Sequence, residues 1–136
     1  MSSSEGVPLA VILSAANEHD VNFILPLVYT KLPRIGGLRG RPREFPSTVR
    51  ADCGYTSKDV LAVFDMSGIE AEIPQRGKDS EPGLGKRRWP VERCIAWLKQ
   101  YRRVGTRRDR IAKTYHSFVT LACAMITFKQ LTAAQF

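Results

Sequence analysis

RWPVERCIAWLK, residues 88–99, is the stretch around which the rest of this chain is organised. Its apolar residues Val91, Ile95 and Leu98 are spaced four and three apart, which predicts one apolar face of an α-helix. Pro90 fits the first turn of that helix, because the N–H group that proline lacks would have no partner there. We therefore expect a helix that packs this face against a core.

Charged residues form a second stripe on the same predicted helix. Glu92 and Lys99 lie two helical turns apart and share one side, and Arg88 lies one turn before Glu92. From the pattern alone, Glu92 and Lys99 are a surface charge stripe, which is the commoner nature of such a pair. The stripe by itself does not establish a site.

A second acid follows a predicted strand. Thr48–Asp52 predicts a short strand that ends in the acid, and Gly54 permits a tight turn after it. A helix at Lys58–Ser67 and a strand at Ile69–Ile73 follow, the strand from its period-two alternation of apolar residues and glutamates. Together they predict a strand–helix–strand unit with a parallel crossover. From the pattern alone, Asp52 could be a simple turn acid before Gly54.

Periodicity and composition place the other elements. Val7–Ala15 is a continuous apolar run with β-branched residues, which predicts a buried strand. Asp20 is expected to be an N-cap and not a ligand. The stretches 32–47 and 74–88 are rich in Pro, Gly and charge, so we expect basic loops. Further helices are expected at about Val21–Lys31, Arg88–Arg103 and Ile111–Leu131, with a disordered N-terminus at 1–6 and a tail at 132–136.

Composition limits the class of protein. The 136 residues are 43% hydrophobic, which suits one domain or part of one. The net charge of +8 favours a polyanionic partner, nucleic acid first. Cys53, Cys94 and Cys123 form no CxxC pair, which argues for a reducing compartment and against a disulfide scaffold or zinc knuckle. The first residues lack the apolar run of a signal peptide, and the longest apolar stretch is too short for a bilayer.

These segments together resemble bacterial insertion-sequence transposases, whose DDE catalytic triad lies on an RNase H-like fold. The pattern Arg–x3–Glu–x6–Lys in Arg88–Lys99 resembles the glutamate signature of that family. Arg50–Tyr55, RADCGY, resembles its A-D-x-G-Y segment, which carries the second triad aspartate. Val7–Val11 followed by Ala16–Asp20 resembles the strand and turn before the family's first core helix. One position departs, because the fuller signature has a tyrosine where this chain has Gly85.

The resemblance implies a fold, a site and a reaction. It implies an α/β protein with a partial RNase H-like fold, a mixed sheet flanked by helices, in which residues 7–131 are the C-terminal part of a catalytic domain. Asp52 and Glu92 match two of the triad acids and would hold Mg²⁺ or Mn²⁺ in a two-metal site, since a cation relieves the repulsion of converging carboxylates. Lys99 would hold a phosphate beside them as a third catalytic residue. The implied reaction is metal-dependent DNA strand cleavage at the ends of the insertion sequence, followed by strand transfer.

Basic residues concentrate around the predicted helix. Between Lys86 and Lys113 lie eleven of the 21 lysines and arginines, against Glu92 and Asp109 alone. Such a surface binds DNA phosphates with a steep salt dependence, although the loop 32–47 is equally well explained as a solvated connector. We expect a protein of the bacterial cytoplasm that associates with the nucleoid. The residues expected to contact double-stranded DNA, both transposon ends and target, are Arg41, Arg43, Arg88, Arg93, Lys99, Arg102, Arg103, Arg107 and Arg108.

The resemblance lacks one part. In the family, the first aspartate lies on a strand that precedes the one matching Val7–Ala15, and only MSSSEG precedes that segment here. We therefore expect an incomplete metal site, a sheet without its N-terminal strands and little activity of this chain alone. A separate N-terminal transposase fragment would then be a partner, and the active form is expected to be an oligomer.

Two other functions remain open. The chain could be a catalytically dead basic DNA-binding remnant of a transposase, which keeps the basic surface without the chemistry. It could instead be an unrelated ribosome- or RNA-associated protein, in which Asp52 and Glu92 have no special role.

Overall fold

The structure, a computed structural model, describes residues 1–30, 40, 44–74 and 84–133, and of residues 84–88 the backbone alone. The chain divides into two compact units. The sheet unit is Ser14–Glu81, and the helical unit combines Met1–Leu13 with Pro82–Phe136. Helices and a small parallel sheet make this an α/β protein, which confirms the predicted class.

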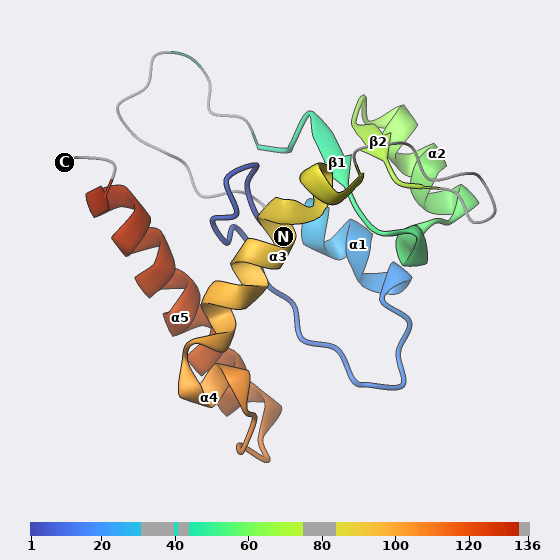
Figure 1. Ribbon diagram of the computed structural model, residues 1–136. Coiled ribbons are helices and arrows are strands. Elements are labelled where there is room, and N and C mark those ends of the chain that lie inside the picture. The colour runs from blue at the N-terminus through green and yellow to red at the C-terminus, as the bar shows by residue number, and fades with distance from the viewer. Residues whose placement is uncertain (31–39, 41–43, 75–83, 134–136) are drawn as a thin grey trace. The chain divides into compact units, whose positions relative to one another are not determined.

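The sheet unit is built on one strand–helix–strand crossover (Figure 1). β1 (Thr48–Arg50) pairs in parallel with β2 (Glu70–Glu72), and α2 (Lys58–Met66) connects them. The crossover predicted from the sequence is therefore confirmed. The mixed sheet is not seen in the described part of the chain, whose named strands are these two.

Buried apolar residues explain why this crossover forms. Val60 and Phe64, four residues apart on α2, are buried, and Phe64 has 0% exposure. Ile69 and Ile73 flank β2 and are buried as well. Gly68 has φ +66°, a conformation that glycine adopts without a steric penalty, and it follows the end of α2.

Two further elements complete the sheet unit. α1 (Val21–Val28) lies within the helix predicted at Val21–Lys31, contains Pro26 within its span, and buries Ile24 and Val28. The short 3₁₀ turn η1 (Cys53–Tyr55) follows β1 and packs against α1. β1 is therefore held by its partner strand β2, and the turn η1 that follows it is held by α1.

The helical unit consists of three helices that pack on one another (Figure 1). α3 (Leu84–Lys99) is followed by the single turn α4 (Arg102–Gly105) and by α5 (Ala112–Ala133). On α5, Val119, Ala122 and Ile126 recur three and four residues apart and are buried, which is one helical face.

α5 buries only part of its apolar surface. Ala122 and Ile126 are buried. Leu121, Met125 and Phe128 are 56%, 43% and 67% exposed, respectively. α5 is apolar on more sides than its neighbours in this unit cover, so hydropathy alone could not select the buried side.

A glycine sets the turn from α3 into α4. A Cβ added to Gly105 would lie 2.5 Å from the carbonyl oxygen of Lys99. Real Cβ atoms essentially never come within 3.0 Å of another heavy atom. The end of α3 and the end of α4 therefore touch backbone to backbone, and only glycine fits there without movement.

α3 differs from the predicted helix in its start and in its buried face. It begins at Leu84, so Pro90 is an interior residue and 84–88 is not loop. Val91 and Ile95 are 50% and 46% exposed, and Cys94 is buried instead. Among residues 89–99, whose side chains are described, the half-buried and buried positions are Pro90, Arg93, Cys94, Trp97 and Leu98, a face rotated from the predicted one.

Arg93 explains the rotation. Its guanidinium carbon lies 4.7 Å from the centre of the Trp89 ring and 4.4 Å from that of Trp97. Stacking on aromatic rings lets an arginine be half-buried while it keeps its charge. Hydropathy counts Arg93 as a surface residue, so the predicted face avoided it.

The N-terminal segment is not a strand. Met1–Ala10 turns back on itself, with the amino group of Met1 donating to the carbonyl of Ala10 at 2.7 Å. Within Val7–Ala15, the strand prediction was wrong, because one isolated antiparallel bridge, Ser2 with Pro8, is its only ladder contact in the described residues. A strand needs a neighbour to pair with, and apolar composition cannot supply one.

Candidate functional site

Asp52 lies just beyond the carboxyl end of β1. Its Oδ1 accepts a hydrogen bond from the backbone N–H of Cys53 at 2.7 Å, which makes it the N-cap of η1 and fixes the carboxylate at the turn. The residue is exposed. The carboxyl end of a parallel strand is where open α/β sheets present their functional groups.

A cross-strand ion pair holds the backbone that precedes Asp52. Arg50 and Glu72 stand opposite each other in the β1–β2 register. Arg50 donates to both carboxylate oxygens of Glu72, from Nε at 2.5 Å and from Nη2 at 3.1 Å. A two-point contact of this kind restrains the strand end by geometry as well as by charge.

Tyr55 and Asp20 accompany Asp52. Partial burial, with smaller contributions from the negative charges of Asp20 and Asp52, raises the pKa of the Tyr55 hydroxyl above its ordinary value. Asp20 occupies the N-cap position of α1 but makes no side-chain capping hydrogen bond. Asp20 was predicted to be a cap and not a ligand, and was not grouped with Asp52. The sequence feature from which the group of Asp20, Asp52 and Tyr55 could have been predicted is Tyr55, three residues after Asp52 in the RADCGY segment.

Glu92 and Lys99 lie on α3, and both side chains are exposed. Their seven-residue spacing places them on one side of the helix, as predicted. Asp52 belongs to the sheet unit and Glu92 to the helical unit, so their convergence stays a prediction. Among the described residues, no group of three or more His, Cys, Asp or Glu side chains is placed to hold a metal ion.

Several of the predicted DNA-binding arginines have partners inside the protein. Arg93 lies between two tryptophan rings, as described above. Arg103 donates to Asp109 Oδ1 at 2.7 Å and stacks on Phe118. Arg107 donates to the Asp109 carbonyl at 3.1 Å and stacks on Tyr115. Their charges are retained, but their positions are set by the fold.

Other basic residues of the same region are exposed. Lys99, Arg102 and Arg108 are exposed, and within the described residues no ion pair to them is found. Arg110 is exposed in the same way, although it is not among the residues predicted to contact DNA. The side chain of Arg88, and the whole of Arg41 and Arg43, lie outside the described residues.

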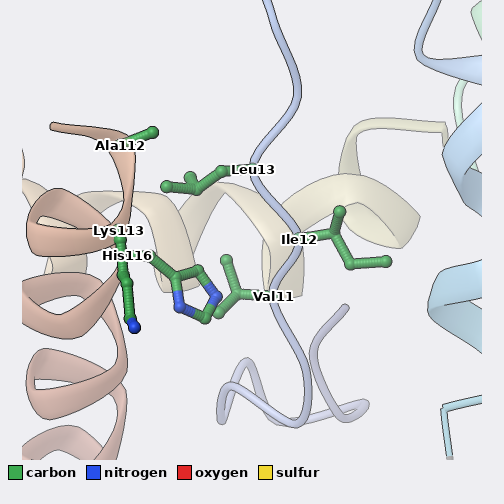
Figure 2. Close-up of a pocket in the computed structure, with 6 residues that line it drawn as sticks. All are labelled: Val11, Ile12, Leu13, Ala112, Lys113 and His116. Carbon is green, nitrogen blue, oxygen red and sulfur yellow. The ribbon is translucent and has the colours of Figure 1, made fainter.

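The helical unit has a hollow of about 340 Å³ away from these groups. Figure 2 shows the His116 ring of α5 turned toward Val11, with Lys113 on the same side of the helix. None of the predicted site residues lines it, and the lining is mostly apolar.

Among the described helices, none combines the length and apolarity needed to cross a membrane.

Comparison with known proteins identifies the family. The family model described as "Transposase DDE domain" matches residues 49–129, more than half of the chain. A curated protein of Burkholderia cepacia, "Putative transposase for insertion sequence element IS402", is 41% identical over 134 residues, which are 98% of this chain and 63% of that relative. The chain therefore spans less than two thirds of the relative's length. No solved structure is significantly similar. The chain belongs to the transposase DDE domain family.

Proposed function

We propose that this chain acts in DNA transposition as the part of an insertion-sequence transposase that carries two catalytic carboxylates, Asp52 and Glu92. The observation that carries the proposal is the family match, whose residues 49–129 include both acids and Lys99. The position of Asp52 beyond the carboxyl end of a parallel strand supports it. In this proposal residues 7–131 belong to an RNase H-like catalytic domain.

The donor set fits a hard divalent cation. Asp52 and Glu92 offer only oxygen ligands, and both side chains are exposed. Mg²⁺ and Mn²⁺ prefer such ligands. When bound, such ions activate an attacking oxygen and stabilise a leaving oxygen in phosphodiester displacement. Further ligands would come from another transposase segment, which we propose as a partner in an oligomeric complex.

The other residues position the DNA. Lys99 lies about 10 Å further along α3 than Glu92, given a helical rise of about 1.5 Å per residue. Its ammonium group would therefore hold a phosphate beside the scissile one and not the reacting atoms themselves. Arg102 and Arg108 extend the positive surface beyond the end of α3.

A nicking assay tests this function. The chain is incubated with supercoiled plasmid DNA in Mg²⁺ or Mn²⁺, and the relaxed form is quantified on a gel. We expect little nicking by this chain alone. When a separate N-terminal transposase fragment is added, we expect cation-dependent nicking that Asp52→Asn and Glu92→Gln each abolish. Asp65→Asn, which removes an exposed acid from α2, should nick like the unmodified chain. Nicking that survives both site substitutions would remove Asp52 and Glu92 from the catalytic role.

A second function is favoured by one observation. The exposed arginines and lysines of α3, α4 and the start of α5 lie in one compact unit, whereas the two carboxylates lie in different units. Such a unit could bind DNA without any chemistry. Salt-sensitive DNA binding without nicking, measured with the N-terminal transposase fragment present, would support this non-catalytic function and count against the first.

A further inference from the structure

The segment Arg102–Arg110, which we name the arginine turn, joins α3 to α5 in the helical unit and contains α4. It holds five arginines and one acid, Asp109. Two of the arginines meet at that acid, since Arg103 Nη2 donates to its Oδ1 at 2.7 Å and Arg107 Nε to its carbonyl at 3.1 Å. The Asp109 carboxylate therefore holds Arg103, and its backbone carbonyl holds Arg107.

Aromatic side chains of α5 contact the same two arginines. The guanidinium carbon of Arg103 lies 4.1 Å from the centre of the Phe118 ring, and that of Arg107 lies 5.2 Å from the centre of Tyr115. The Tyr115 hydroxyl donates to the carbonyl of Val104 at 2.9 Å, which ties α5 to α4. Each of the two arginines thus lies over a ring and donates a hydrogen bond to Asp109, Arg103 to the carboxylate and Arg107 to the backbone carbonyl.

Asp109 is an unusual residue for a basic surface. Its side chain is only 10% exposed, and its Oδ2 is buried without a hydrogen-bond partner among the described residues. Burying a carboxylate that lacks some of its hydrogen bonds costs free energy, so this ion pair is not expected to contribute much to the stability of the fold. A role in positioning the arginines accounts for an acid at this place.

Three arginines of the turn remain outside this arrangement. Arg102, Arg108 and Arg110 are exposed, and no ion pair to them is found in the described part of the chain. Guanidinium groups bind phosphate oxygens in a planar, two-point geometry, and they do so with less loss of freedom when they are already held in place. The turn therefore combines two guanidinium groups that contact Asp109 and an aromatic ring with three arginines that are exposed to solvent.

We propose that the Asp109 carboxylate is a positioning group that sets Arg103, beside Arg107 on the Asp109 backbone carbonyl, so that the arginine turn binds the phosphodiester backbone of DNA. This rests on the proposed function, which supplies DNA as the partner. The inference makes an acid necessary for binding a polyanion. Electrostatics without positioning predicts the opposite, because removing Asp109 raises the net charge from +8 to +9.

The test compares Asp109→Asn with Asp65→Asn, which changes the net charge equally at an exposed residue of α2 in the sheet unit. Affinity of the whole chain for a duplex of arbitrary sequence is measured by fluorescence anisotropy over a range of salt. We expect Asp109→Asn to bind about tenfold more weakly, the effect of one charge-assisted hydrogen bond. We expect Asp65→Asn to bind equally or slightly more tightly. Arg102→Ala and Arg108→Ala should each lower the slope of log affinity against log salt by about 0.9.

A second variant keeps the inference testable if Asp109→Asn does not fold. Arg103→Lys preserves the charge but not the planar group that stacks on Phe118 and meets Asp109, so it should weaken binding while tryptophan fluorescence stays unchanged. Binding by Asp109→Asn or by a folded Arg103→Lys that equals that of the unmodified chain would overturn the inference and leave the proposed function standing. No DNA binding by the unmodified chain would overturn both.

Discussion

Gly105→Ala should destabilise the helical unit by an amount that follows from the geometry. The new methyl would lie 2.5 Å from the Lys99 carbonyl oxygen, 3.3 Å from its carbon and 3.5 Å from its Cα, where ordinary contacts begin at 3.4 Å. The obstacle is backbone at the end of α3, which cannot turn aside as a side chain can. Overpacking of this kind costs about 1–3 kcal/mol, and replacing a helical glycine returns about 0.5–1 kcal/mol. We expect a net loss of about 1–2 kcal/mol.

Urea unfolding followed by tryptophan fluorescence measures this loss. Both tryptophans of the chain lie on α3, so their emission reports on the helical unit. The midpoint should fall with an unchanged slope, because the surface exposed on unfolding does not change. Gly54→Ala is the matched control, since a Cβ there would meet nothing within 4 Å and its φ is not in the positive range. A Gly105→Ala midpoint equal to that of the unmodified chain would show that α3 and α4 are not in backbone contact.

Two further predictions concern the sheet unit. Phe64→Ala should cost about 3–5 kcal/mol, because Phe64 is fully buried; circular dichroism during urea unfolding measures the loss, and a cost below about 1 kcal/mol would contradict the described core. Tyr55 has a raised pKa, so its contribution to stability is complete below pH 10 and is lost as the pH rises through the folded-state pKa. Absorbance titration at 295 nm, with Tyr55→Phe to identify the signal, should show that Asp52→Asn lowers this pKa; an unchanged value would mean that the two groups do not interact.

The crossover of the sheet unit could be predicted because each of its signals is local. The alternation through Ile69 and Ile73 and the sequence of the helix predicted at Lys58–Ser67 are features of consecutive residues, and the predicted helix and strand were confirmed. The same local logic failed for Val7–Ala15. Whether an apolar run pairs as a strand depends on a neighbour, which may be distant in sequence.

The candidate site shows the same division. From spacing alone, Asp52 was a turn acid, and Glu92 and Lys99 were a surface charge stripe. The resemblance to the transposase family singled them out, and the family match confirms the assignment of the chain. The contacts of Arg93 with tryptophan rings, and those of Arg103 and Arg107 with Asp109, could not be predicted, because they depend on which faces of the helices meet. A count of charges treats every arginine alike, whereas packing fixes the positions of some arginines and leaves others exposed.

Calorimetric titration of Mn²⁺ is the measurement that tests the central claim most directly, since it asks whether Asp52 and Glu92 share a cation. The account predicts that the unmodified chain binds Mn²⁺ and that Asp52→Asn/Glu92→Gln does not. Glu5→Gln/Asp65→Asn, which also removes one exposed acid from each unit, should bind as the unmodified chain does. Binding that is unchanged in Asp52→Asn/Glu92→Gln, or absent from the unmodified chain, would contradict the account and favour a protein that binds DNA without catalysing its cleavage.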